Sequence, residues 1–260
     1  MRQSVTVLTV TRRRPRWLLR CIDSVRRLVG VEAEHIVLID DCDETDRALA
    51  GAEHRRLTRF LRRRRPGEAS GPAHLAGLRN LMIRMATSEW VAFLDDDNVF
   101  AEEHIASLLA CAEETGAAAV HSWMRMFDAT GQPHTSARWP WSRDDAAGEA
   151  KYRIMAAKGV VTRDDNIVRE AIDNYPARCV DTSAWLLRRS ALGDTPMDPT
   201  FTLAEFEANK AEDDHLHAYI LSQGLKVACT ERATLRYALG GYSTNHDGRS
   251  DRAETWRWAD

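Results

Sequence analysis

The first half of the chain alternates between two hydrophobic patterns. Short apolar runs predict buried β-strands at residues 4–10, 35–39, 90–94 and 117–121. Apolar residues that recur every three or four positions predict helices near residues 17–28, 75–85 and 102–114. Strands that alternate with helices are typical of an α/β fold, in which helices flank a single, mostly parallel sheet.

Two stretches are harder to assign. After the strand that ends at Asp40-Asp41, the chain carries Leu49, Leu57 and Phe60, which we assign to one helix. Residues 123–175 have scattered tryptophans, turns and charges, and we expect an irregular region that faces the substrate. Beyond it we predict a strand at 180–187, a helix at 211–222 and a last core strand at 226–229.

Composition restricts the class of protein. The chain has 260 residues, 44% of them hydrophobic, which is enough for one large domain with a substantial core. A net charge of −3 gives no overall attraction to nucleic acid or anionic lipid. The five cysteines lack Cys-x-x-Cys spacing and predict reduced thiols in a cytoplasmic protein. The first strand begins at Ser4 and no segment is long and apolar enough to span a membrane, so we expect neither signal peptide nor transmembrane segment.

The strongest chemical signal is the apolar run 90–94, which ends in Asp95, Asp96 and Asp97. Open α/β folds bind ligands at the carboxyl ends of their strands, so these acids are placed where a ligand would lie. Adjacent carboxylates repel one another unless a cation neutralises them, and all-oxygen ligands suit Mg²⁺ or Mn²⁺. A solvated acidic turn that caps the following helix is the simpler alternative, and the segment alone leaves it open.

Four motifs occur in order, at residues 9–15, 37–41, 77–80 and 94–98, and together they resemble those of family 2 glycosyltransferases of the GT-A fold. The segments Asp181–Trp185 and Glu212-Asp213 resemble the acceptor-side strand and the acidic pair of that family. The chain departs from the family pattern at Val10, Arg12 and Arg13, and again in the turn at 42–46. These departures affect the loops that would contact the donor.

The resemblance implies a metal-dependent, inverting glycosyltransferase of the hexosyltransferase type, with Mn²⁺ or Mg²⁺ as its cofactor. The donor would be a nucleotide-sugar, with a UDP-sugar favoured and a GDP-sugar possible, and the acceptor a hydroxyl of a small molecule or glycan. Residues 1–120 would form the nucleotide-sugar-binding half of one GT-A domain, and residues 121–260 its acceptor-binding and catalytic half.

Chemistry and resemblance together assign the donor site. A metal ion would neutralise the departing diphosphate, and its expected ligands are Asp97, Asp95 and His246. The expected contacts with the nucleotide-sugar come from Thr11, Asp41, Arg79, Asp95 and Asp96. Each of these residues also has an ordinary structural role open to it, as a turn residue, a helix cap or a solvated charge.

The acceptor hydroxyl must lose a proton as it attacks, and a carboxylate on the acceptor side suits that role. Asp213 is our candidate base, and Glu212 is the other member of the acidic pair. Glu212 and Asp214 are close alternatives for the base, because a shift of one residue in the start of the helix would change which carboxylate faces the cleft. An acidic helix N-terminus that only complements the helix dipole is the structural alternative.

Two other functions remain open. A nucleotidyltransferase that makes nucleotide-sugars also uses acidic metal ligands, but it usually has a Gly-rich phosphate loop, and residues 11–15 contain no glycine. A non-catalytic module that binds nucleotide-sugars would not need carboxylates at both Asp97 and Asp213. The terminal Trp256 and Trp258 are expected to pack on the body of the protein or on a partner subunit, which makes a homodimer possible.

Overall fold

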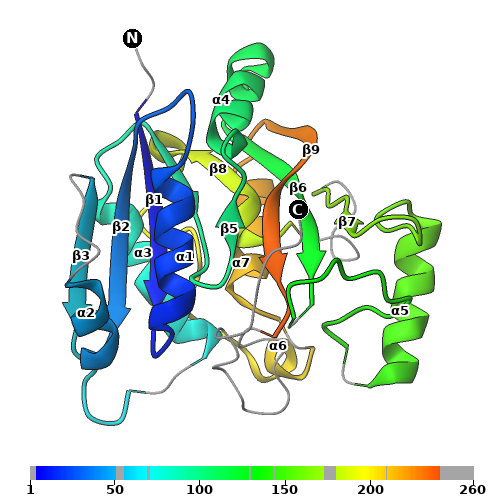
Figure 1. The fold of residues 1–260 in the computed structure, drawn as a ribbon, viewed down its shortest axis with the longest axis horizontal. Coiled ribbons are helices and arrows are strands. Elements are labelled where there is room, and N and C mark those ends of the chain that lie inside the picture. The colour runs from blue at the N-terminus through cyan, green and yellow to red at the C-terminus, as the bar shows by residue number, and fades with distance from the viewer. Residues whose placement is uncertain are drawn as a thin grey trace.

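The computed structural model describes residues 4–50, 56–68, 71–128, 130–142, 144–172, 180–208 and 210–240. They form one nine-stranded sheet with helices packed against it (Figure 1). Strands from both sides of residue 120 belong to this sheet, in the order β3-β2-β1-β4-β8-β6-β9-β5, and β7 pairs with β6. The predicted architecture, a mostly parallel sheet flanked by helices, is confirmed.

The first four strands are parallel and adjacent. They are β1 (Val5–Thr11), β2 (Ala33–Asp40), β3 (Leu57–Arg62) and β4 (Trp90–Phe93). The helices between them are α1 (Pro15–Arg26), α2 (Asp43–Leu49) and α3 (Pro72–Met85). Parallel neighbours require a crossover connection, and these helices supply it while covering the sheet.

The second half adds strands in both directions. They are β5 (Val99–Phe100), β6 (Ala119–Phe127), β7 (Ile167–Val168), β8 (Trp185–Arg188) and β9 (Val227–Ala238). The helices are α4 (His104–Thr115), α5 (Asp145–Ala157), α6 (Leu203–Glu207) and α7 (Glu212–Ser222), with short 3-10 turns at Thr182–Ala184 and Arg189–Ala191. Because β8 is antiparallel to both β4 and β6, strands β4 and β6 point the same way and end at the same edge of the sheet.

Side chains on β2 alternate between two cores. Val37 and Ile39 pack with Leu18 and Ile22 of α1, whereas Leu38 joins the larger core on the opposite face of the strand. Strand β4 is buried along its whole length, as expected for a central strand covered on both faces. Full burial of β4 fixes the position of the acids that follow it.

One predicted helix is wrong. Leu49 ends α2, but Leu57 and Phe60 belong to strand β3, which pairs in parallel with β2. In this short edge strand Thr58 and Phe60 are exposed and their neighbours are less so, which is the period of two that a strand requires. The helical interpretation joined apolar residues across a gap that contains two separate elements.

The expected irregular region also contains regular structure. Strand β6 continues to Phe127, and α5 occupies part of the stretch assigned to loops, with Asp144 capping it by accepting a hydrogen bond from the Ala147 amide at 2.8 Å. The strand predicted at 180–187 is shorter, because residues 182–184 form a 3-10 turn, and the last strand is longer than predicted.

Membrane-spanning character is a separate question. Across the described ranges, no helix combines the length and apolar character needed to cross a bilayer.

Candidate active site

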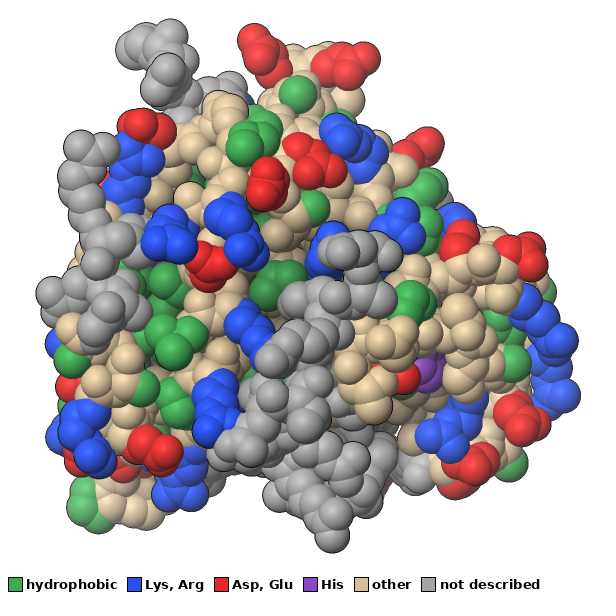
Figure 2. Space-filling view, in the orientation of Figure 1, with side chains coloured by type: hydrophobic (Ala, Val, Ile, Leu, Met, Phe, Trp, Pro, Cys, Tyr) green, Lys and Arg blue, Asp and Glu red, His purple; other side chains and the backbone are tan. Residues whose placement is uncertain are grey.

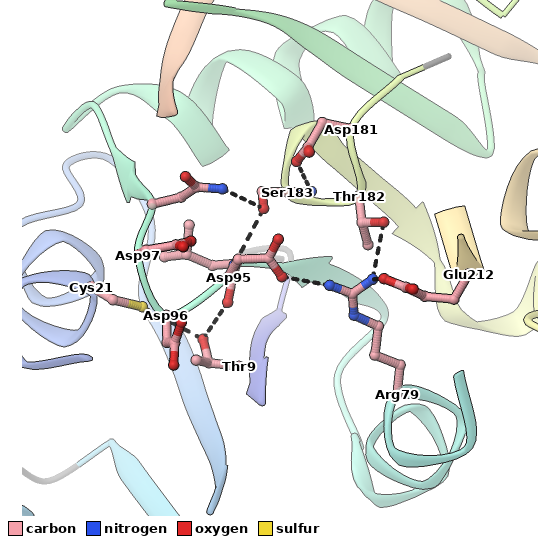
Figure 3. A network of polar contacts seen from close by, with 12 residues as sticks. Thr9, Cys21, Arg79, Asp95, Asp96, Asp97, Asp181, Thr182, Ser183 and Glu212 are labelled. Atoms are coloured by element: carbon pink, nitrogen blue, oxygen red, sulfur yellow. Dashed lines mark hydrogen bonds and ion pairs between the residues drawn. The ribbon is translucent and has the colours of Figure 1, made fainter. Parts of the chain in front are cut away.

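The three acids after β4 point in different directions (Figure 3). Asp95 accepts a hydrogen bond from Arg79 at 2.5 Å. Asp96 accepts from the Thr11 hydroxyl at 2.7 Å and from Arg14 at 3.0 Å, and Asp97 accepts from the same Arg14 nitrogen at 2.8 Å. Two arginines therefore neutralise the acid triplet from opposite sides.

Arg79 is the centre of a buried network. Its side chain is only 5% exposed, although it lies on α3 at the rim of the sheet. One guanidinium nitrogen bonds Asp95, and the other bonds both the Thr182 hydroxyl, at 3.1 Å, and the carboxylate of Glu212. The network in Figure 3 thus joins the acid that follows β4 to the first residue of α7.

Ser183 and Asn98 brace the acidic loop. The Ser183 hydroxyl accepts a hydrogen bond from the Asp95 amide at 3.2 Å and from the Asn98 side chain at 3.1 Å. The Asn98 carbonyl in turn accepts from the Ala238 amide at 3.0 Å. Two distant segments, at Ser183 and at Ala238, therefore fix the backbone from which the acids project.

The acids of α7 have separate roles. Glu212 pairs with Arg79, and Asp214 caps its own helix by accepting from the Ala211 amide at 2.9 Å. Within the described ranges, Asp213 neither forms an ion pair nor caps the helix; its carboxylate accepts only from the adjacent Asp214 amide, at 2.9 Å. Burial and then the charges of Glu212 and Asp214 raise the pKa of Asp213 well above its ordinary value.

A fourth carboxylate lies nearby. Asp181 accepts a hydrogen bond from the Ser183 amide at 2.8 Å. Its burial and then the charge of Asp95 raise its pKa to about 7. Repulsion from the charge of Asp181 also contributes to the raised pKa of Asp213.

Burial also dominates the donor-side acids. It raises the pKa of Asp97 to about 7, with repulsion from Asp96 and Asp95 acting in the same direction and Arg14 opposing it.

On the face seen in Figure 2, basic side chains lie over α1, the helix that begins directly after Arg14. At the start of this helix, Arg14 brings a positive charge into contact with Asp96 and Asp97.

The side chains after β4 could supply only part of the coordination of a metal ion. Among the described residues, no group of three or more His, Cys, Asp or Glu side chains is arranged to hold one, since Asp96 turns toward Thr11 and Arg14. Mg²⁺ and Mn²⁺ sites that include substrate phosphates need only one or two carboxylates, and the oxygens of Asp97 and Asp95 are suitable. The expected ligand His246 lies outside the described residues.

The remaining predicted donor contacts lie at the same edge of the sheet. Thr11 is buried and holds Asp96, so it acts on the site through that acid. Asp41 follows β2 with a positive φ of 52°. Its side chain is 36% exposed and forms an ion pair with Arg63 at 3.6 Å. Its neighbour Asp40 is buried and held by Arg64 and His74. Asp41 is therefore the acid of this pair that a ligand can reach.

The structure brings most of the predicted residues into two adjacent networks. In one, Arg79 bonds Asp95 and Glu212, and in the other, Asp96 bonds Thr11 and shares Arg14 with Asp97. Sequence reasoning missed the role of Arg14 as the partner of two acids, and it missed Asp181 as a buried carboxylate. The position of Arg14, four residues after a predicted strand, was a usable signal. Asp181 lies in the segment that resembles the family's acceptor-side strand, but that resemblance did not indicate a buried carboxylate.

Comparison with known proteins gives a consistent result. The family model for Glycosyl transferase family 2 matches residues 6–195, from the second residue of β1 to beyond the end of β8. No curated protein sequence matches this chain closely enough to be significant.

Solved structures share the fold. TarS 1–349 from S. aureus, in complex with UDP-GlcNAc, is 15% identical with a TM-score of 0.58, and the alignment covers 95% of this chain and 61% of that one. The mannosyltransferase PcManGT from Pyrobaculum calidifontis, in complex with GDP-Man and Mn²⁺, is 16% identical with a TM-score of 0.57, covering 94% and 59%. This chain thus spans about three fifths of the length of either structure.

Proposed function

This chain belongs to glycosyl transferase family 2, and on that premise we propose that it transfers a sugar from a nucleotide diphosphate donor to an acceptor hydroxyl. A UDP-sugar is the favoured donor and a GDP-sugar the alternative, because TarS was crystallised with UDP-GlcNAc and PcManGT with GDP-Man. The carboxylate of Asp41 can accept hydrogen bonds from the imide of uracil or from the ring and amino nitrogens of guanine.

One observation carries the proposal. The buried guanidinium of Arg79 bonds Asp95, which follows the donor-side strand, and Glu212, which precedes Asp213 on the acceptor side. The planar guanidinium contacts one carboxylate through each terminal nitrogen, so it sets the distance between the two parts of the site. Such positioning is what a transfer between two bound substrates requires.

The chain's own residues then have distinct roles. Asp213 takes the proton of the acceptor hydroxyl as that oxygen bonds to the anomeric carbon, and the bond from this carbon to the diphosphate oxygen breaks. Attack from the face opposite the leaving group inverts the anomeric centre. Glu212 and Arg79 position the base, while Arg14 places a positive charge beside the acids of the donor site.

A divalent cation, Mg²⁺ or Mn²⁺, would be held by Asp97 with Asp95. When bound, it would supply positive charge that stabilises the departing diphosphate. The raised pKa of Asp97 fits this role, because a buried carboxylate among other carboxylates gains most from a nearby cation.

The test compares three variants with the wild-type protein. Asp97→Asn should abolish the metal-dependent rise in melting temperature with UDP or GDP, whereas Asp213→Asn should keep that rise and lose about 100-fold or more in turnover. Asp164→Asn removes an exposed acid outside the network and should change neither quantity. Failure of both nucleotides to bind in the presence of Mn²⁺, or full turnover by Asp213→Asn, would refute the proposal.

A further inference from the structure

Helix α1 has a buried face and an exposed face. Its buried residues are Trp17, Leu18, Cys21, Ile22, Ser24 and Val25. From Arg16 onward, the remaining positions lie along the outer side, because residues three, four and seven positions apart share one face of a helix. We call them the outer stripe, and its members are Arg16, Leu19, Arg20, Asp23, Arg26 and the C-cap residue Arg27. The outer stripe runs along the face of the molecule seen in Figure 1 and Figure 2, over about 18 Å of helix.

The outer stripe is basic. Four of its six residues are arginines and one, Asp23, is an acid, so the stripe carries a charge of +3 in a protein whose net charge is −3. Asp23 pairs with Arg26 and with Arg27, at 2.6 Å in each case. The side chains of both arginines nevertheless stay more than half exposed. Positive charge is therefore concentrated on this side of the protein, in excess of what Asp23 neutralises.

A second basic run, at residues 62–65, has a different environment. Its arginines pair with acids of neighbouring segments: Arg62 with Glu68 and Arg63 with Asp43, each at 2.5 Å, and Arg64 with Asp40. Each of these three arginines thus has an acid of its own, whereas the outer stripe has one acid for four arginines. An anionic partner would gain more from the outer stripe than from this run.

Apolar side chains lie among these charges. Leu19 belongs to the outer stripe and is 38% exposed, and Val29, two residues beyond Arg27, is 50% exposed. The aromatic residue of α1, Trp17, is instead buried, with the Arg20 guanidinium 5.5 Å from its ring centre. Exposed aliphatic residues beside arginines suit the boundary between lipid headgroups and acyl chains. Nucleic-acid sites combine arginines with neutral polar side chains or with exposed aromatic rings on which bases stack, and the outer stripe has neither.

We propose that the outer stripe docks this protein on a membrane surface that contains anionic lipids. The arginines would lie among the lipid phosphates, and Leu19 would reach the boundary with the acyl chains. Because α1 begins directly after Arg14, which bonds Asp96 and Asp97, the donor-side acids would lie close to the headgroups. The outer stripe shares no residue with the acid network, so this binding does not depend on the proposed transferase function.

The experiment measures by sedimentation how the full chain partitions onto lipid vesicles. One set of vesicles is phosphatidylcholine alone, and the other is an equal mixture of phosphatidylcholine and phosphatidylglycerol. The wild type should bind the anionic vesicles at low ionic strength and be released as salt is added, because salt screens exposed charges. Equal binding to both sets of vesicles, or binding to neither, would refute the proposal.

Two variants test whether α1 is the docking surface. Each arginine near an anionic surface strengthens binding about fivefold, so Arg16→Gln/Arg26→Gln/Arg27→Gln should bind about 100-fold more weakly. Asp23→Asn removes the acid of the outer stripe and should bind about fivefold more tightly. A gain of this kind cannot come from misfolding.

The matched control removes three positive charges from α5 and its C-cap, toward the other end of the molecule (Figure 1). Lys151→Gln/Arg153→Gln/Lys158→Gln lowers the net charge as much as the α1 variant does, and it should bind within about twofold of the wild type. An equal loss in both triple variants, or no gain in Asp23→Asn, would show that binding does not occur through α1.

Leu19→Ser separates a lipid surface from other polyanions, because it leaves the charge unchanged. Loss of the leucine side chain should weaken vesicle binding about tenfold. Unchanged vesicle binding by Leu19→Ser, or tighter binding of a duplex DNA oligonucleotide than of anionic vesicles, would overturn the lipid assignment. The rise in melting temperature with UDP or GDP and Mn²⁺ is measured on the same wild-type preparation, so failure of the donor site and failure of docking are seen separately.

Discussion

Replacing Arg79 by Met would remove the charge that joins the two halves of the site while keeping an unbranched side chain. The change leaves Asp95 and Glu212 without their common partner and frees the Thr182 hydroxyl. Breaking a buried ion pair by removing one partner costs about 3–5 kcal/mol, against a total stability of about 5–15 kcal/mol for a typical domain. The variant should therefore fold with a large fraction of its stability lost.

The loss should depend on pH in a defined direction. Burial already raises the pKa of Glu212 above 4.5, and loss of the guanidinium would raise it further. When the pKa of a carboxyl group is higher in the folded state than in the unfolded state, the folded state loses stability as the pH rises. The loss occurs between the pKa of the unfolded state and the pKa of the folded state. The cost of Arg79→Met should thus be smaller at pH 5 than at pH 8, because Glu212 carries less negative charge at the lower pH.

Urea unfolding followed by circular dichroism at both pH values measures this cost. The double variant Arg79→Met/Glu212→Gln should recover part of the lost stability, because it removes one of the two carboxylates that Arg79→Met leaves without a partner. Arg26→Met is the matched control, since its ion pair with Asp23 has a similar length of 2.6 Å but is exposed, and it should cost less than about 1 kcal/mol. A cost below about 1 kcal/mol for Arg79→Met at pH 8, or one that does not fall at pH 5, would refute the buried network.

Two further predictions concern stability. The pKa of Asp181 is about 7 in the folded protein and 3.8 ordinarily, so the free energy of unfolding should fall as the pH rises from 4 to 8. Asp181→Asn should remove up to about 4 kcal/mol of that fall, measured by urea unfolding across this range. An unchanged pH profile in the variant would contradict the prediction. A Cβ on Gly148 would lie 2.3 Å from Cγ of Arg138 and 3.2 Å from the Trp139 carbonyl, so Gly148→Ala should destabilise by about 1–3 kcal/mol. A Cβ on Gly77, which lies in helix α3, would have no other atom within 4 Å, so Gly77→Ala should instead stabilise the protein by about 0.5–1 kcal/mol. Thermal unfolding compares the two variants, and equal effects would refute the steric argument.

The sequence by itself determined most elements of the first half of the fold. Buried strands such as β4 are continuous apolar runs, and the helix α1 shows a clear amphipathic period, so local pattern was enough to place them. The acids after β4 could also be located, because the carboxyl end of a strand is a position along the chain. Strand β3 was misassigned because an exposed edge strand has too few buried residues to show its period.

Only the tertiary structure decided which groups meet. Arg79 and Glu212 are 133 positions apart, and no local pattern states that one guanidinium bonds both Glu212 and Asp95. The raised pKa values of Asp97 and Asp181 likewise result from burial by segments that are distant in the sequence. Helix α5 lies in a stretch that the sequence assigned to irregular structure, because its buried residues Tyr152 and Met155 find their apolar neighbours in the large core, which distant segments build.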